Sequence, residues 1–128
     1  DGNSFICGSD DGNIRLVDLR SDCELNTYNL MVKLPTSKRS FDGANSIIST
    51  SSYDIPGVMS IDVSKSYRLM YACYADYGCV IWDLVKNELV GSIGSGHHQS
   101  KINQVGVSSD GLAVASASWD STIRVWSV

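Results

Sequence analysis

Short runs of alternating hydrophobic and polar residues, bounded by Gly, Asp, Asn and Ser, recur along the chain. Such alternation, with many β-branched residues, is typical of half-buried β-strands, and no segment has convincing helical spacing. The pattern therefore predicts an all-β protein. The predicted strands are Ser4–Cys7, Ile14–Leu19, Leu25–Tyr28, Gly57–Val63, Leu69–Cys73, Cys79–Leu84, Leu89–Ile93, Ile102–Val107, Ala113–Ser116 and Ile123–Trp126.

One strand–turn–strand unit occurs three times, within residues 9–18, 74–83 and 109–128. The turn residues Asp76 and Asp120 hold equivalent places 44 positions apart, within the ~40–45 residues of one four-stranded propeller blade. Closed propellers have about 4–8 blades. We therefore expect a β-propeller fragment with about two four-stranded antiparallel blades and a long inserted loop.

The distance from Asp11 to Asp76 is 65 positions, about 20 more than one blade needs. The surplus lies in a polar stretch rich in Ser and Asn, which indicates an inserted loop. Its Ser and Thr residues are candidates for regulatory phosphorylation, and a plain spacer is the alternative. The predicted division is a partial blade over 1–28, the inserted loop over 29–56, a full blade over 57–93, and a last blade without its outer strand over 94–128.

The 128-residue chain is 43% hydrophobic and 19% charged, with a net charge of −4. This balance argues against nucleic acid as a partner, because binding a phosphate backbone requires a basic surface. No apolar run approaches the roughly 18 residues of a membrane span, so we expect no direct membrane insertion. The four cysteines have no C-x-x-C spacing and lie far from both histidines, so we expect packed, reduced thiols, no metal and no cofactor.

Four polar or aromatic residues of the last unit can form a hydrogen-bonded chain. The candidates are His98 (or His97), Ser116, Asp120 and Trp126. We expect this tetrad to be structural, because buried polar groups that satisfy one another fix a blade. The alternative is a catalytic triad, but its Ser would lie within a strand and the Trp N–H would leave no room for substrate.

The other two units carry only part of this tetrad. The middle unit has Asp76 and Trp82 but Ala72 in the Ser position, and the first unit keeps only Asp11. The pattern of the three units resembles the WD-repeat family, whose members form WD40 β-propellers.

Several strings resemble, more closely, the C-terminal part of a heterotrimeric G-protein β subunit. The Asp-Leu-Arg-x-Asp string and the Ser-Trp-Asp-Ser turn are the most specific, and Tyr67 departs from the family by replacing its usual Gly. The segment 74–83 and the inserted loop are similar to β subunits of the yeast mating-pheromone pathway. The strings are Gly8–Asp11, Arg15–Asp22, Ser64–Leu69, Asp110–Ala115 and Ser118–Ser121.

The resemblance implies two opposite binding faces. By motif match, Asp10 and Trp119 contact the G-protein α subunit or an effector, whereas Arg20, Asp22 and Leu25 map to the face that binds the γ subunit. The plain alternatives are a solvated turn acid for Asp10 and a local ion pair between Arg20 and Asp22, which is worth little at a surface.

The function that the resemblance implies is a non-catalytic transducer that binds Gα-GDP and Gγ and signals to downstream effectors, in a fungal pheromone response. A prenylated γ subunit would place it in the cytoplasm at the inner face of the plasma membrane. One alternative is a WD-repeat scaffold, such as a substrate receptor of a ubiquitin ligase. Another is a hydrolase that uses His98, Ser116 and Asp120.

Overall fold

The protein is described by a computed structural model over residues 2–30, 56–75, 77–93 and 98–127. Ten β-strands lie in these ranges, each within a few residues of a predicted strand. The largest differences at strand ends are at β3, which already begins at Cys23, and at β9, which continues to Ser118. The strands are β1 (Ser4–Gly8), β2 (Asn13–Asp18), β3 (Cys23–Asn29), β4 (Val58–Val63), β5 (Leu69–Tyr74), β6 (Gly78–Asp83), β7 (Glu88–Ile93), β8 (Ile102–Val107), β9 (Ala113–Ser118) and β10 (Ile123–Ser127).

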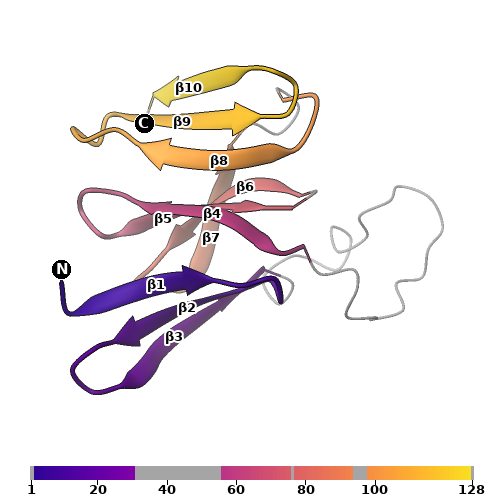
Figure 1. Cartoon of the computed structure of the whole chain (residues 1–128). Coiled ribbons are helices and arrows are strands. Elements are labelled where there is room, and N and C mark those ends of the chain that lie inside the picture. Colours follow the sequence, from indigo (N-terminus) through magenta and orange to yellow (C-terminus); the bar gives the residue numbers. More distant parts are fainter. Residues whose placement is uncertain (1, 31–55, 76, 94–97, 128) are drawn as a thin grey trace.

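The strands form three antiparallel sheets (Figure 1). The first sheet has the order β1-β2-β3, the middle sheet β4-β5-β6-β7, and the last sheet β8-β9-β10. Each strand pairs with its neighbour in sequence, and the middle sheet lies between the other two. This arrangement confirms the predicted all-β class with stacked antiparallel sheets.

Irregularities in the strand pairing repeat from sheet to sheet. The first strands of the middle and last sheets both shift register, between Val58 and Ser60 and between Ile102 and Gln104. These two shifts are 44 positions apart, the same spacing that separates the turn acids. Bulges are features of a particular backbone path, so their recurrence shows that the sheets repeat one unit.

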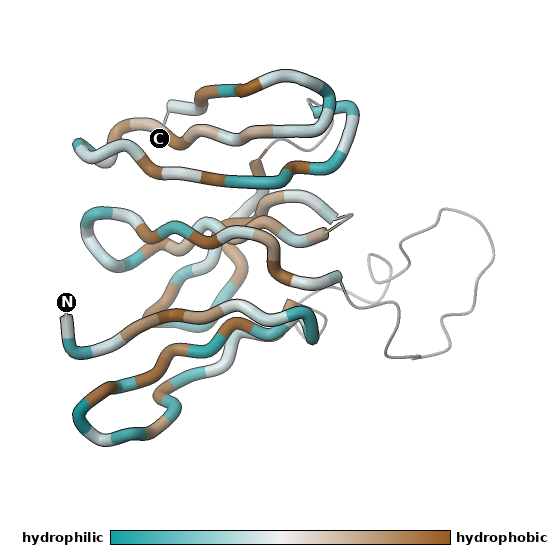
Figure 2. The backbone as a smooth tube through the Cα atoms, viewed as in Figure 1, coloured by the Kyte–Doolittle hydropathy of each residue, from teal (hydrophilic) through white to brown (hydrophobic). Residues whose placement is uncertain are grey.

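The core lies on both faces of the middle sheet, because successive side chains of a strand point to opposite sides. Figure 2 shows the hydrophobic positions within the strands and the hydrophilic ones gathered at the turns. One cluster joins the middle sheet to the first, and the other joins it to the last. The buried members of the former are Ile14, Tyr28, Leu30, Met70, Ala72, Tyr74, Val80 and Trp82, and those of the latter are Tyr71, Cys73, Cys79, Ile102, Val105 and Val114.

Polar contacts also cross between the sheets. The Tyr28 hydroxyl donates to the Leu84 carbonyl at 2.9 Å, and the Asp62 carboxylate accepts the Val107 amide at 2.7 Å. The first contact ties the first sheet to the middle one, and the second ties the middle sheet to the last. The three sheets are therefore linked by hydrogen bonds as well as by apolar packing.

The turns lie at two opposite ends of the sheets (Figure 1). The turn between β1 and β2 and the turn between β9 and β10 lie at one end, here named the Trp119 face. The turns that join β2 to β3, β4 to β5 and β8 to β9 lie at the other end, here named the Arg20 face.

Most of the predicted insertion, together with Asp76 and His97, lies outside the described residues. β3 ends at Asn29, one residue beyond Tyr28, where the strand was expected to end, and Leu30 is buried in the core. Among the described residues, no helix is both long enough and apolar enough to cross a membrane.

Candidate functional site

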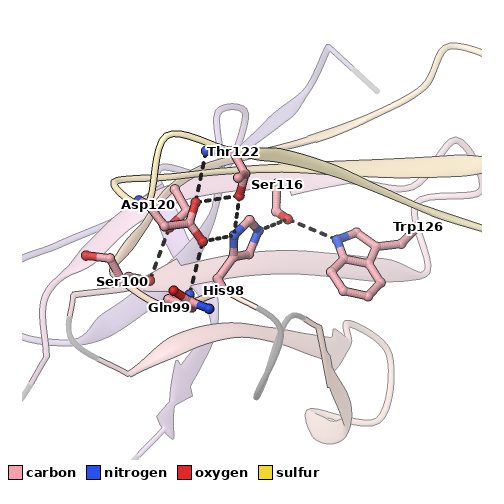
Figure 3. A network of polar contacts seen from close by, with 8 residues as sticks. His98, Gln99, Ser100, Ser116, Asp120, Thr122 and Trp126 are labelled. Carbon is pink, nitrogen blue, oxygen red and sulfur yellow. Dashed lines mark hydrogen bonds and ion pairs between the residues drawn. The ribbon is translucent and has the colours of Figure 1, made fainter.

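Four side chains of the last sheet form a chain of hydrogen bonds (Figure 3). His98 precedes β8, Ser116 lies within β9, Asp120 lies in the β9–β10 turn and Trp126 lies on β10. His98 Nδ1 is 3.1 Å from Asp120 Oδ2, and His98 Nε2 is 2.7 Å from Ser116 Oγ. The Trp126 indole N–H donates to Ser116 Oγ at 2.9 Å. The structure thus brings together His98, and not His97, with the other three predicted residues.

Asp120 fastens the β9–β10 turn to the segment before β8. Its carboxylate accepts the Gln99 amide at 3.0 Å, the Thr122 amide at 2.9 Å and the Thr122 hydroxyl. The Thr122 hydroxyl, then the Gln99 amide and His98, hold the pKa of Asp120 well below its usual 3.8. Asp120 is therefore an ionised acceptor at neutral pH.

The partners of His98 indicate how the protons are arranged. An ionised Asp120 can only accept, so His98 Nδ1 carries a proton and donates to it. Ser116 Oγ already accepts from Trp126, and its own proton can go to His98 Nε2. With this arrangement the imidazole is neutral, and every hydrogen-bonding atom of the four-residue network has a partner. A polar network can be buried without a large cost only under this condition.

Burial separates this network from a working catalytic triad. The side chain of His98 is 1% exposed and Ser116 is 0% exposed. A nucleophile must reach the reacting carbon, and its oxyanion needs donors nearby. Ser116 instead lies inside a strand, with the Trp126 N–H directed at its oxygen. The geometry fits a polar network that fixes the blade.

In the middle sheet, the equivalent tryptophan N–H has a single aromatic residue as its hydrogen-bond acceptor, and sequence analysis missed this residue. Trp82 has the position in β6 that Trp126 has in β10, and Ala72 stands in the Ser position. Trp82 Nε1 donates to the Tyr74 hydroxyl at 3.2 Å, and both residues are buried. Tyr74 lies two residues after Ala72 and therefore on the same side of β5, which is the signal that could have predicted this partner.

Trp119 is held firmly by its backbone while its side chain is open to solvent. Its amide donates to the Lys101 carbonyl at 3.0 Å, next to the β8–β9 pairing, and the residue is 70% exposed. The neighbouring Asp120 carries the hydrogen bonds that fix the turn. A large aromatic group presented from a fixed backbone loses little conformational entropy on binding a partner.

Asp10 is exposed in the β1–β2 turn, at the same end of the sheets as Trp119. In that turn, Asp11 accepts the Asn13 amide at 2.9 Å and pairs with Arg15 at 2.8 Å. The Arg15 guanidinium is the main cause that lowers the pKa of Asp11 to about 2. Asp10 and Trp119 come from turns of different sheets, and they share a face without being neighbours in one turn.

The residues predicted for the opposite face lie at or just after the β2–β3 turn. Arg20 is paired with Asp18, with Nε–Oδ1 at 4.0 Å, and the expected partner Asp22 instead adopts a left-handed backbone with φ of 48°. Leu25 is 55% exposed. Leu19, from the same turn, is another exposed hydrophobic residue on this face.

The comparisons with known proteins agree with this geometry. Residues 88–127 match the family described as "WD domain, G-beta repeat". The chain carries a WD40 repeat. It is 44% identical over 99% of its length to the guanine nucleotide-binding protein subunit beta of Saccharomyces cerevisiae, of which it covers 33%.

More distant relatives carry the same kind of name. Subunit beta of Solanum tuberosum is 35% identical, and subunit beta-5b of Danio rerio is 38% identical, each over 98% of this chain. The alignments cover 29% and 26% of those two proteins, so the chain spans about a third or less of the relatives it matches. The three sheets therefore correspond to part of a WD40 propeller, in a protein that is similar to G-protein β subunits.

Sequence analysis also missed an acid that recurs at the ends of two strands. Asp83 ends β6, is 6% exposed, and accepts the Val85 and Lys86 amides at 3.0 Å each. Asp18 ends β2 in the same way and accepts the Arg20 amide at 3.0 Å. The signal was available, because Asp18 and Asp83 stand equally far after the turn acids Asp11 and Asp76 of their units. Over the described ranges, no three His, Cys, Asp or Glu residues are grouped so that they could hold a metal ion.

Proposed function

We propose that this chain is part of a G-protein β subunit that acts as a non-catalytic transducer in a fungal pheromone response. The observation that carries the proposal is the exposed Trp119 on a fixed backbone, in a chain 44% identical to a yeast protein named as a β subunit. The first, middle and last sheets are then three successive blades of the propeller.

The Trp119 face is the proposed site for the α subunit in its GDP-bound state. Trp119 is the aromatic anchor, a residue type that dominates binding energy at protein interfaces, and Asp10 is a charged contact from the first sheet. Downstream effectors use the same face once the α subunit has left. The mechanism is competition for one surface, which requires no chemistry from this chain.

The Arg20 face is the proposed site for the γ subunit. Leu25 supplies exposed apolar area, and Arg20 and Asp22 supply polar contacts at its edge. Because the two faces lie at opposite ends of the sheets, one partner stays bound while the other exchanges. A prenyl group on the γ subunit would hold the complex at the inner face of the plasma membrane, with no insertion of this chain.

Two other functions are less well supported. A WD-repeat scaffold of another complex would need no γ-binding face, so binding to a prenylated γ subunit separates the two proposals. A hydrolase based on Ser116 conflicts with the burial of His98 and Ser116. Any turnover that survives Ser116→Ala would exclude that triad.

Trp119→Ala in the intact protein tests the proposal. We expect binding of the GDP-bound α subunit to weaken by at least ~2 kcal/mol, about 30-fold in Kd, because a central aromatic anchor is lost. The measurement is α-subunit titration by calorimetry, with γ-subunit binding measured on the same preparation.

Leu25→Ala is the matched control on the opposite face. We expect it to weaken γ binding and leave the affinity for the α subunit unchanged. An unchanged α affinity in Trp119→Ala would remove this residue from the site. Equal loss of both partners in Trp119→Ala would indicate unfolding instead of a lost contact.

A further inference from the structure

We infer that Gly57 is a positioning residue for the partner-binding turn that carries Asp10, an inference that rests on the proposed function of the Trp119 face. Gly57 lies directly before β4, and the structure places its Cα against the β1–β2 turn of the first sheet. A Cβ atom added at Gly57 would lie 3.0 Å from Asp10 Oδ1, 3.1 Å from Asp10 Cα and 3.5 Å from its carbonyl oxygen.

Glycine is needed at position 57 for space. Gly57 does not have a positive φ, so residues other than glycine can adopt its backbone conformation. One of the atoms that an added Cβ would meet is the Asp10 Cα. This atom belongs to the backbone and cannot move aside as the end of a flexible side chain could. Even one methyl group at position 57 must therefore displace the Asp10 turn or β4.

The two segments are also tied by a hydrogen bond and by a second close approach. The Val58 amide donates to the Ser9 carbonyl at 3.0 Å. A Cβ atom at Gly8 would lie 2.4 Å from Val58 Cγ1, so the backbone of β1 passes directly over β4. The residues before Asp10 thus rest on the residues after Gly57, with little free space between the two sheets.

The residues of the turn are linked to one another by hydrogen bonds. The Ser9 amide donates to the Asn13 carbonyl and the Gly12 amide to the Ser9 carbonyl, each at 3.1 Å, and Asp11 caps Asn13. Asn13 in turn accepts a hydrogen bond from the Asn29 side chain at 2.8 Å. We therefore expect a displacement at Gly57 to be passed on to the whole turn, because these hydrogen bonds link its residues.

This arrangement decides where Asp10 stands relative to the rest of the Trp119 face. The backbone of Trp119 is set by Lys101 within the last sheet, whereas that of Asp10 is set by contact between the first and middle sheets. The affinity of a partner that contacts both residues depends on the distance between them. Gly57 fixes that distance while its own atoms need not touch the partner.

Gly57→Ala in the intact protein, bound to its γ subunit, tests the inference by titration with the purified GDP-bound α subunit. We expect Kd to rise roughly three- to tenfold, with γ binding unchanged. Gly91→Ala is the matched control: it makes the same chemical change on β7, where an added Cβ meets nothing within 4 Å. We expect its Kd to equal that of the unmodified protein.

A double-mutant cycle with Asp10→Ala identifies the route of the effect. If Gly57→Ala acts by moving Asp10, its effect shrinks in the Asp10→Ala background, since two changes that act through one contact are not additive. Full additivity would overturn the positioning role. So would equal loss of α and γ binding in Gly57→Ala, which would show general disruption of the sheets.

The same data separate this inference from the proposed function. If Trp119→Ala and Asp10→Ala weaken α binding but Gly57→Ala behaves like Gly91→Ala, the positioning role is wrong and the proposed face stands. If neither Trp119→Ala nor Asp10→Ala changes α binding, the proposed face fails, and the role of Gly57 fails with it.

Discussion

The middle and last sheets place a tryptophan at the same position and satisfy it in different ways. In the middle sheet, Trp82 is fully buried and donates to the phenol of Tyr74 at 3.2 Å. In the last sheet, Trp126 is partly exposed and donates to Ser116, the start of a chain that continues through His98. One indole N–H is thus served by a single aromatic residue in one sheet and by a polar network in the other.

The difference follows from what surrounds each tryptophan. Trp82 is packed in the core between the first and middle sheets, where its ring and that of Tyr28 form a T-shaped pair with centroids 5.7 Å apart. Apolar packing fixes it, and one hydrogen bond suffices. In the last sheet the network also holds a turn, because Asp120 binds the Gln99 and Thr122 amides. A polar network is therefore retained where it positions the turn that presents Trp119.

The largest expected effect comes from removing the packed tryptophan. Trp82→Ala should lower the free energy of unfolding by about 3–5 kcal/mol, because it leaves a cavity in the core between the first and middle sheets. Trp126→Ala makes the same change in the last sheet and should cost less, since that side chain is partly exposed. Chemical denaturation of the intact protein followed by circular dichroism measures both. Equal losses would show that the network contributes as much as the packing.

A smaller effect is expected from breaking the polar network at its centre. Ser116→Ala removes the acceptor of the Trp126 indole and the partner of His98 Nε2 at once. A buried polar group that loses its partner costs ~1–3 kcal/mol. Two groups lose a partner here, and because Trp126 is partly exposed we expect a total near the lower end of the sum, about 2–3 kcal/mol. Hydrogen exchange should show loss of protection at the Gln99 and Thr122 amides, because Asp120 is then held by fewer contacts.

Ser118→Ala is the matched control on the same strand. The Ser118 hydroxyl donates to the Ser100 carbonyl and accepts the Asp120 amide, each at 3.2 Å. Ser118 is half-buried at the end of β9, so water can replace its hydroxyl in both contacts. We expect a change below about 1 kcal/mol. If Ser116→Ala lowers the free energy of unfolding as little as Ser118→Ala does, the hydrogen bonds of the tetrad are not what fixes the turn.

The strands were predictable from sequence because each sheet is a local repeat. Alternation, turn residues and the 44-position spacing of Asp76 and Asp120 all act over a few residues or one unit. Strand ends were less accurate: β9 runs to Ser118, because the ladder with β8 continues where side-chain alternation no longer signals it. The segment before β4 had no period to follow, so its boundaries were read from composition alone.

The candidate site was predictable only where its residues repeat a known spacing. His98, Ser116, Asp120 and Trp126 follow one unit and meet as the spacing predicts. The link from Trp82 to Tyr74 depends on how two side chains meet across paired strands, and the contact of Gly57 with Asp10 depends on how two sheets pack. Sequence periodicity describes a strand's faces but not the separation of two backbones, so these contacts required the structure.

The smallest expected effect compares two equivalent turns. Tyr67 and Gly111 stand 44 positions apart, and each donates its amide to the carbonyl of a serine three residues earlier at 2.9 Å. Both adopt a positive φ, 57° for Tyr67 and 76° for Gly111. A left-handed conformation costs a tyrosine about 1–2 kcal/mol, and glycine loses part of this advantage through its greater freedom when unfolded.

Tyr67→Gly should therefore raise the free energy of unfolding by about 0.5 kcal/mol, measured by denaturation as for the larger changes. Asn87→Gly is the control, since Asn87 has a φ of 53° but tolerates it and binds Asn26 and Thr27 through its side chain. We expect that variant to be destabilised. A loss of stability in Tyr67→Gly would show that the tyrosine ring, 65% exposed, makes contacts that offset its backbone strain. The middle sheet would then rely on side-chain packing of Tyr67 where the last sheet has a favourable turn glycine. In the same way it relies on Tyr74 where the last sheet has a polar network.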